Sequence, residues 1–327
     1  MRTLVYWIIG ISVVSAAALV LLLTLLIFLR IFYARRRKPR GAKEFPLPDG
    51  EVYKPHYEQM IRWIQGIRAM EHADVSITSY DGLTLRGKYY ECEKGAPIEI
   101  LFHGYRGSAE RDLCGGVHRC FSIGHNALIV DQRTAGGSEG RVITFGAKES
   151  RDCLAWVYFV IQKIDRDARI ILTGISMGAA TVMLAASMAL PSNVIGVLAD
   201  CGYTSTKAII QKVIRDMKLP AKLLYPFVRL GARLFGGFDP DADSPIESMK
   251  RCRIPVIFFH GDTDDFVPCS MSEENYAACA AERKRLVIIH GAGHGLCFPV
   301  DADTYLEELN NFFPCKAKSS IDKSAKE

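Results

Sequence analysis

One serine in this chain stands where a nucleophile is needed. Ser176 occupies the middle of the sequence Gly-Ile-Ser-Met-Gly, directly after the β-branched run 170–173 and just before a small-residue stretch that begins at Ala179. This order predicts a strand, a sharp turn and a helix, with the serine hydroxyl exposed at the apex of the turn. The two flanking glycines remove side chains that would collide in so tight a turn. Ser176 is therefore the candidate nucleophile.

A serine nucleophile needs a base, and one histidine is well placed to supply it. His294 lies in the sequence His-Gly-Ala-Gly-His-Gly, which follows the apolar run 286–289. A glycine-flanked loop can carry this side chain over the edge of a sheet toward Ser176. His290, at the end of the run itself, is expected to be packed. His294 is thus the candidate base.

The histidine in turn needs a carboxylate on its other ring nitrogen, which fixes its tautomer and holds the imidazolium. The loop after the apolar run 256–259 contains three acidic residues, and among them we favour Asp264. Asp200 follows the earlier run 194–198 and is the competing candidate, because an acid there could reach the same place.

An acyl-transfer site also needs backbone amides that stabilise an oxyanion. The sequence His-Gly-Tyr-Arg-Gly-Ser begins at His103, after the apolar run 98–102, and its glycines let the backbone turn amides toward a substrate. The N–H groups of Tyr105 and Met177 are the candidate oxyanion donors, with an ordinary glycine-rich turn as the alternative. His103 is expected to orient this loop. The loop 131–140 could hold a polar substrate, but a hydrogen-bonded loop is favoured.

The elements that must position these residues form an alternating series. The predicted strands are 75–79, 83–90, 98–102, 126–130, 169–173, 194–198, 256–259 and 286–289. The predicted helices between them are 111–121, 145–164, 179–190, 272–281 and 303–313. Asp81-Gly82 predicts a hairpin between the first two strands. Short buried strands between helices predict an α/β fold with a mainly parallel sheet covered on both faces, and chemistry collects at the carboxyl ends of its strands.

A helical insertion, residues 204–249, interrupts the series after the strand 194–198. Two sets of apolar residues recur in it at helical spacing: Ile209, Ile210, Val213, Ile214 and Met217, then Leu223, Leu224, Phe227, Leu230 and Leu234. Its position predicts a cap above the serine turn whose apolar face lines an acyl-binding pocket. The alternative is a helical pair that shields the sheet.

The N-terminal part predicts a membrane anchor. Residues 4–29 carry no charge and would extend about 39 Å as a helix, enough to cross a bilayer with some tilt. A cleaved signal peptide is the alternative, but the apolar run is too long for one. Basic residues 30–40 outweigh Arg2, so the positive-inside rule places the rest of the chain in the cytosol. A linker and an amphipathic helix, with apolar residues from Tyr57 to Ile67, should follow.

Composition agrees with one large domain plus this appendage. The chain has 327 residues, of which 49% are hydrophobic. Eight Lys and Arg residues precede the first acid, Glu44, so the net charge of +5 becomes −3 from Glu44 onward, which argues against nucleic-acid binding. The ten cysteines show no zinc-ligand spacing and fit a reducing compartment, although an exported, disulfide-bonded body remains the alternative.

Taken together, these motifs resemble the α/β-hydrolase family over about residues 74–313. The matching pieces are His103-Gly104, the serine turn 174–178, the acid turn 260–268 and Gly293-His294. The resemblance implies Ser176 as nucleophile, His294 as general base and then acid, Asp264 as its orienting carboxylate, and no metal or organic cofactor. The loop 131–140 and the insertion look like the monoacylglycerol-lipase and serine-aminopeptidase-like branch.

We therefore expect a membrane-anchored serine hydrolase that cleaves lipid-like or small carboxylic esters through an acyl-enzyme intermediate. A serine aminopeptidase or amidase, which would share the triad, and a non-catalytic scaffold are the alternatives. The expected regions are an anchor (1–34), a basic flank with linker and amphipathic helix (35–73), the hydrolase domain (74–315) with its cap insertion (204–249), and a disordered tail (316–327).

Overall fold

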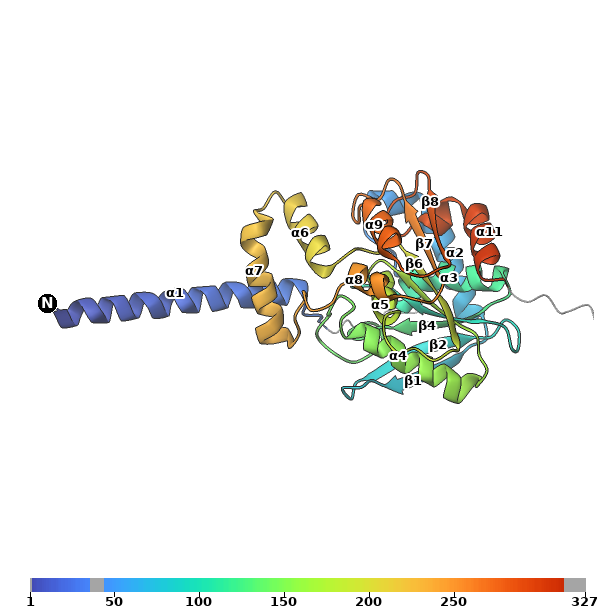
Figure 1. Ribbon diagram of the computed structural model, residues 1–327, viewed down its shortest axis with the longest axis horizontal. Helices are drawn as coiled ribbons and strands as arrows, with labels where there is room; N and C mark the ends of the chain where they lie inside the picture. The colour runs from blue at the N-terminus through green and yellow to red at the C-terminus, as the bar shows by residue number, and fades with distance from the viewer. Residues whose placement is uncertain (1, 36–43, 315–327) are drawn as a thin grey trace, which may run out of the picture.

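The computed structural model describes residues 2–35 and 44–314 (Figure 1). Most of the predicted basic cluster, residues 36–40, and the predicted tail, 316–327, lie outside the described residues.

A sheet of eight strands forms the centre of the molecule. Its strands are β1 (Ala73–Thr78), β2 (Thr84–Tyr90), β3 (Ile98–Phe102), β4 (Asn126–Asp131), β5 (Ile170–Ile175), β6 (Val194–Asp200), β7 (Val256–Gly261) and β8 (Lys284–Ile289). Their order across the sheet is β1-β2-β4-β3-β5-β6-β7-β8. The β1–β2 and β2–β4 pairs are antiparallel and all later pairs are parallel. The predicted opening hairpin and mainly parallel sheet are confirmed.

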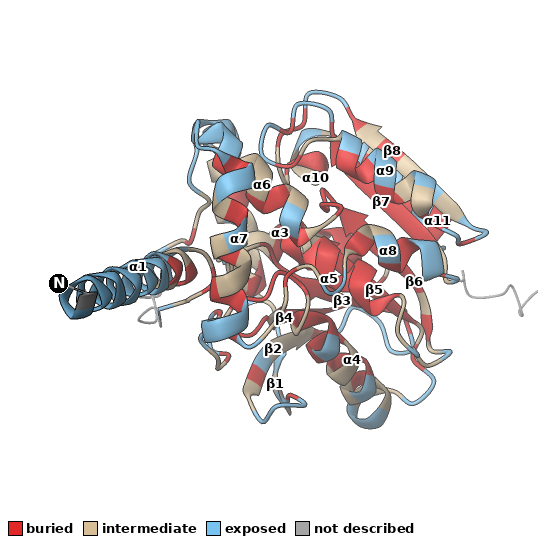
Figure 2. Ribbon diagram, turned by 60° about the vertical axis from the view of Figure 1, so that its left-hand side comes forward, coloured by how far each residue is buried: buried red, intermediate tan, exposed pale blue. Residues whose placement is uncertain are grey.

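The central strands are buried on both faces, as their continuous apolar sequences predict. In β3, Ile100 and Phe102 point into one core, with Trp156, whereas Leu101 points into the other. Helices α4 (Glu149–Phe159), α5 (Met177–Ala185), α8 (Pro245–Arg251) and α9 (Ser270–Ala278) pack around the first core. Helices α2 (Tyr57–Ala69), α3 (Ala109–Ser122), α10 (Cys297–Val300) and α11 (Ala302–Phe312) lie on the opposite face. The burial colouring of Figure 2 shows the central strands as buried.

The helix predicted over 145–164 begins later than expected. Phe145 and Gly146 have φ values of 55° and 102°, outside the helical region, so α4 starts only at Glu149. The buried Glu149 carboxylate accepts hydrogen bonds from the backbone N–H groups of Thr144 and Gly146, at 2.8 and 3.0 Å. A π-helical turn, η2 (Val160–Ile164), continues the helix to the expected end.

The insertion is helical, as predicted, but the packed face of its second helix is not the one expected. It contains α6 (Thr206–Asp216), α7 (Ala221–Gly231) and a π-helical turn η3 (Ala232–Gly236), before α8. In α7 the buried side chains are those of Ala221, Tyr225 and Val228. Leu223 and Leu234, from the predicted apolar face, are 66% and 54% exposed.

The N-terminal helix α1 (Arg2–Ile31) projects from the body beside the insertion (Figure 1). It is the one helix among the described residues that is long and apolar enough to cross a membrane. Residues 3–23 are all exposed, whereas Thr24, Phe28 and the following Phe32 are buried against the body. The last two turns of α1 therefore belong to the packed structure, next to α7.

Candidate active site

Ser176 sits at the junction of β5 and α5 in a strained conformation. Its φ is 56° and its ψ is −116°, a region that costs a non-glycine residue about 1–3 kcal/mol. The turn is possible because both neighbouring glycines lack a side chain: a Cβ on Gly174 would overlap the Gly178 carbonyl, and a Cβ on Gly178 would overlap the Phe102 carbonyl. The Ser176 N–H donates to the Asp200 carbonyl at 2.8 Å. The predicted serine turn is thus present, but Ser176 is buried and not exposed as expected.

The structure brings the predicted serine, histidine and aspartate together. Nε2 of His294 lies 2.9 Å from the Ser176 hydroxyl oxygen, and Nδ1 of the same ring lies 2.7 Å from Oδ2 of Asp264. Ser176 and Asp264 are buried, and the His294 side chain is 15% exposed. These contacts join residues 118 and 30 positions apart in the chain. The arrangement can pass a proton from the hydroxyl to the imidazole while the carboxylate holds the ring.

Asp264 is held in its ionised form by the groups around it. Oδ1 accepts hydrogen bonds from the N–H groups of Phe266 and Val267, at 2.9 and 2.8 Å. Burial acts to raise the pKa of Asp264, but the hydrogen bonds from His260 and His294 outweigh it and keep the pKa below its usual range. His260 lies 3.2 Å from Oδ2 and also contacts the Val267 carbonyl. It is a fixed neighbour of the aspartate that sequence analysis left without a role.

The competing acid takes a different partner. Oδ2 of Asp200 accepts a hydrogen bond from the Tyr305 hydroxyl at 3.0 Å. Burial raises the pKa of this carboxyl. Asp264, and not Asp200, is therefore the carboxylate hydrogen-bonded to His294.

His290 contradicts its prediction. Its side chain is 87% exposed, and its ring pairs with Asp262 at 2.8 Å. The residue directly follows β8, an edge strand with a half-exposed face, so the end of this run points to solvent and not into a core.

The loop after β3 is fixed from two sides, and its backbone passes close to the serine. A Cβ placed on Gly104 would lie 3.5 Å from the Ser176 Cβ. His103 accepts a hydrogen bond from the Gln132 N–H at 3.0 Å and so orients the loop, as predicted. The Gly104 N–H donates to Asp112 at 3.0 Å. Asp112 carried no motif signal, because its role depends on how α3 folds back beside the loop.

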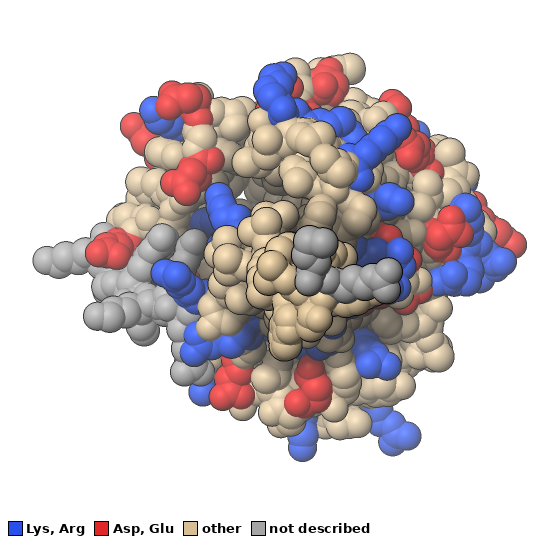
Figure 3. All heavy atoms as spheres, turned by 90° about the vertical axis from the view of Figure 1, so that its left-hand side faces the viewer, with Lys and Arg blue, Asp and Glu red and all other residues tan. Residues whose placement is uncertain are grey.

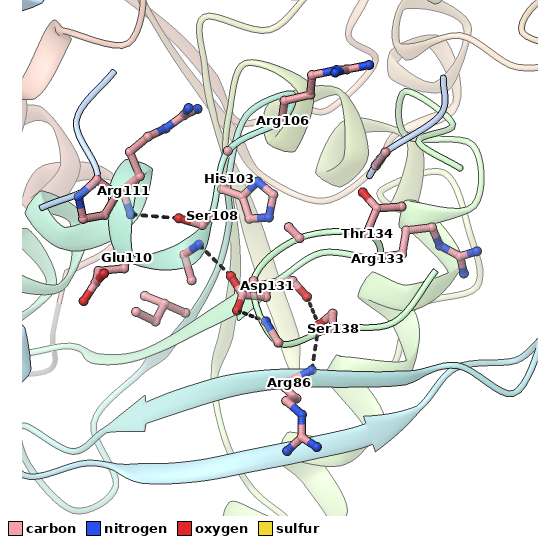
Figure 4. A pocket seen from close by; sticks show the side chains of 18 of the residues that line it. Arg86, His103, Arg106, Ser108, Glu110, Arg111, Asp131, Arg133, Thr134 and Ser138 are labelled. Atoms are coloured by element: carbon pink, nitrogen blue, oxygen red, sulfur yellow. Dashed lines mark hydrogen bonds between the residues drawn. The ribbon is translucent and has the colours of Figure 1, made fainter. Parts of the chain in front are cut away.

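The loop 131–140 is a hydrogen-bonded loop, as favoured. The Asp131 carboxylate accepts from the N–H groups of Ala109 and Gly137, at 2.9 and 3.1 Å. Between this loop, the loop after β3 and the end of α1 lies a cavity of about 980 Å³ (Figure 4). Its wall includes His103 and Met177, so it reaches the serine turn. Several arginines line the cavity, among them Arg30, Arg35, Arg86, Arg106 and Arg111.

Two further residues near the triad were missed by sequence analysis. Tyr53 belongs to a short 3₁₀ helix, η1 (Glu51–His56), and burial, followed by the nearby Cys201 and Asp264, raises the pKa of its phenol. Cys201 is fully buried, has a φ of 47° and follows β6 directly. Burial raises the pKa of its thiol. No motif marks either residue, since only the tertiary fold brings them to the site.

Cys201, Asp264 and His294 are also the one group of three potential metal ligands found among the described residues, with ligand atoms within 4.8 Å of one another. The Asp264 and His294 atoms already hydrogen-bond each other. A metal ion would have to displace this hydrogen bond to be bound by both residues. This donor set fits a proton-transfer chain better than a metal centre.

The fold is shared with solved hydrolase structures. An esterase of Pyrococcus furiosus, Pf2001, is similar to 82% of this chain and 98% of its own, with a TM-score of 0.61 and 22% identity. The α/β hydrolase GrgF of Penicillium is similar to 74% of this chain and 98% of its own, with a TM-score of 0.59 and 17% identity. This chain has the α/β-hydrolase fold.

Sequence comparisons find a family model that matches part of the chain and relatives that match most of it. Residues 197–304 match the family model described as serine hydrolase (FSH1). The uncharacterised protein YqkD of Bacillus subtilis is 26% identical over 270 residues, which are 81% of this chain and 86% of YqkD. The uncharacterised protein Rv2307c of Mycobacterium tuberculosis is 29% identical over 245 residues, 73% of this chain and 78% of its own.

Proposed function

We propose that this protein is a membrane-anchored serine hydrolase that cleaves carboxylic esters. The observation that carries the proposal is the hydrogen-bonded series Ser176, His294 and Asp264, with a serine in a strained turn at the head of α5. The match to the serine hydrolase family model and the esterase among the structural neighbours support hydrolysis as the reaction class.

The proposed reaction has two halves. His294 takes the Ser176 hydroxyl proton as the oxygen attacks the ester carbonyl, and the negative charge that develops on the carbonyl oxygen is stabilised by the N–H groups of Tyr105 and Met177. His294 then gives the proton to the departing alcohol, which leaves an acyl group on the serine. In the second half His294 takes a proton from a water that attacks the acyl carbonyl, and gives it to the Ser176 oxygen as the bond to the acyl group breaks and the acid is released. Asp264 stays ionised throughout and holds the imidazole in the reactive tautomer.

The anchor part of the proposal rests on the length of the exposed run of α1. Residues 3–23 are 21 exposed residues, which extend about 31 Å as a helix, close to the roughly 30 Å hydrocarbon thickness of a bilayer. The expected orientation, with the body in the cytosol, rests on the basic residues after the helix.

The lipid-like substrate class rests on the surface beside the anchor. Five apolar side chains of the insertion are exposed to solvent: Met217, Leu219, Leu223, Leu234 and Phe235. Viewed along α1, the area around the helix is largely uncharged, and both basic and acidic side chains lie around it (Figure 3). An exposed apolar surface beside the anchor suits contact with a bilayer, from which a lipid ester would reach the site.

Hydrolysis of matched substrates tests the function. The full-length protein in detergent should cleave a p-nitrophenyl acyl ester, and Ser176→Ala should abolish turnover and keep the same melting temperature. An aminoacyl anilide should be cleaved far more slowly than the ester. Faster cleavage of the anilide would replace the esterase by an aminopeptidase or amidase, and undiminished ester turnover by Ser176→Ala would reject the mechanism.

The anchor is tested separately in cells. A protease added to intact cells should leave the body uncut, and permeabilisation should expose it. Cleavage in intact cells would contradict the cytosolic orientation, and release of the body by a carbonate wash would contradict a spanning helix.

A further inference from the structure

The end of α1 is built into the loop that follows β3. The Tyr105 hydroxyl donates to the Ile31 carbonyl at 2.6 Å. Arg106 donates through Nη2 to the carbonyls of Arg30 and Tyr33, at 2.8 and 3.1 Å, and through Nε to the Tyr105 hydroxyl oxygen at 2.8 Å. The last carbonyls of a helix have no partner within the helix, and a cation is favourable beside them. Tyr105 and Arg106 therefore cap the C-terminal end of α1.

The same end of α1 is held on its other side. Tyr33 forms an antiparallel bridge with Val142, and the Ile143 N–H donates to the Phe32 carbonyl at 2.8 Å. The ring of Phe145 lies between the end of α1 and the loop after β3, with its centroid 5.7 Å from that of Phe32 and 5.1 Å from that of Tyr105. The helix end, the bridge and the loop after β3 thus form one packed unit.

The backbone conformation of Arg106 indicates that its side chain is needed at this position. Its φ of 53° lies in the left-handed region, where a glycine costs less than a residue with a side chain. Arg106 stands between Tyr105 and Gly107, so the chain has glycine one position later but not at the strained position. The hydrogen bonds that Arg106 makes to α1 and Tyr105 offset that strain, and they are lost with any shorter side chain.

We propose that Tyr105 and Arg106 are positioning residues through which the end of α1 holds the oxyanion-stabilising amide of Tyr105 in place. This inference rests on the proposed function, since it gives the Tyr105 N–H a role in the reaction. The side chain of Tyr105 fixes the loop to α1, and its own backbone N–H is the oxyanion donor that the proposed function assigns. The anchor helix is then part of the catalytic structure as well as a tether.

The test substitution is Tyr105→Phe in the full-length protein, in detergent or nanodiscs. It keeps the backbone N–H and the ring beside Phe145 and removes only the hydroxyl that donates to Ile31 and accepts from Arg106. Tyr33→Phe is the matched control, because it removes a hydroxyl at the same junction that accepts from Arg141 and does not contact the loop. Arg106→Gln is the second test variant, which shortens the side chain at the strained position.

The measurement compares an oxygen ester with the thionoester of the same acyl chain. Sulfur is a weaker hydrogen-bond acceptor on a longer bond, so a well-placed oxyanion donor favours the oxygen substrate. In Tyr105→Phe and Arg106→Gln we expect kcat for the oxygen ester to fall about tenfold or more, with KM nearly unchanged. The upper limit is the loss of about 10²–10³ in kcat that follows the removal of an entire oxyanion donor. The preference for oxygen over sulfur should fall by the same factor, and Tyr33→Phe should keep both values.

An unchanged oxygen-to-sulfur preference in both test variants would overturn the inference, even where kcat falls through loss of folded protein. An equal loss of preference in Tyr33→Phe would also overturn it, because the effect would then belong to the junction as a whole. Failure of the proposed function is distinguishable, since it appears as ester turnover that survives Ser176→Ala in the otherwise unchanged protein.

Discussion

Replacing Asp264 by asparagine keeps the shape of the side chain but removes its negative charge and turns one of its two hydrogen-bond acceptors into a donor. Oδ1 accepts from the N–H groups of Phe266 and Val267, and an asparagine can keep both contacts only with its carbonyl oxygen on that side. The reverse orientation would leave two N–H groups facing an NH₂ group, at about 1–3 kcal/mol each. The new NH₂ group must therefore face Nδ1 of His294, where Oδ2 now lies at 2.7 Å.

The consequence for the histidine sets the size of the effect. With a donor opposite Nδ1, the neutral ring carries its proton on Nε2, and this nitrogen can no longer accept the Ser176 proton. The wrong tautomer in a Ser-His-Asp arrangement lowers kcat by about 10⁴. At 1.36 kcal/mol for each factor of ten, this is about 5 kcal/mol of lost transition-state stabilisation.

The assay is steady-state hydrolysis of a p-nitrophenyl ester by wild type, Asp264→Asn and Asp262→Asn, with melting temperatures for all three. Asp262 lies in the same loop and pairs with the exposed His290, so its substitution controls for loss of a nearby carboxylate and should change kcat less than twofold. A folded Asp264→Asn protein that keeps kcat within tenfold of wild type would refute the tautomer argument, and with it the role given to Asp264.

Three further substitutions test the scaffold. Glu99→Gln leaves the buried Arg119 without its charged partner and should cost about 3–5 kcal/mol of unfolding free energy at neutral pH. Burial acts to raise the pKa of Glu99, but Arg119 and His125 outweigh it and hold the pKa below its usual range. Its stabilisation is therefore present at neutral pH and lost as the pH falls through the folded pKa, so the melting-temperature difference between wild type and variant should shrink in acid; a constant difference would contradict this. Gly178→Ala places a Cβ against the Phe102 carbonyl and should abolish activity or folding, and an active, stable variant would contradict the serine-turn geometry. Ser205→Ala removes the N-cap hydrogen bond to the Ala208 N–H of α6 and should cost about 1 kcal/mol in chemical denaturation, with catalysis unchanged on soluble esters.

The parts of the fold that depend on local sequence could be predicted from the amino-acid sequence. The run at β3 was predicted with the bounds that the structure has, because a buried parallel strand is a continuous apolar segment between turn residues. The Asp81-Gly82 hairpin and the order of strands and helices followed in the same way. Ser176, Asp264 and His294 were found because each follows the end of a strand, and a parallel sheet brings those ends to one edge.

Features that depend on contacts distant in sequence could not be predicted. Asp112 and Tyr53 carry no motif, and each acquires its place through the packing of a helix against the loops. The packed face of α7 was predicted wrongly because apolar spacing alone does not reveal that α1 lies beside it. Small residues form the contact between α7 and α1, where Gly231 lies against the Thr24 carbonyl. A search for hydrophobic spacing does not count glycine and so misses this face.

The cap interpretation changes accordingly. The predicted acyl pocket assumed that the apolar sets of the insertion face the serine turn. In the structure Ile209, Ile210 and Tyr225 share a cluster with Phe28 and Phe32 around α1, and Met177 of the serine turn belongs to it as well. The proposed cap would therefore be built from three segments, namely α6, α7 and the end of the N-terminal helix.

The central claim, an activated nucleophile at position 176, is tested most directly by covalent labelling. The full-length protein would be treated with a fluorophosphonate probe and digested, and the labelled peptide would be identified by mass spectrometry. The account predicts one phosphonylated residue, Ser176, with labelling lost in both Ser176→Ala and His294→Ala. Labelling of another residue, or no labelling of a folded wild-type protein, would contradict it.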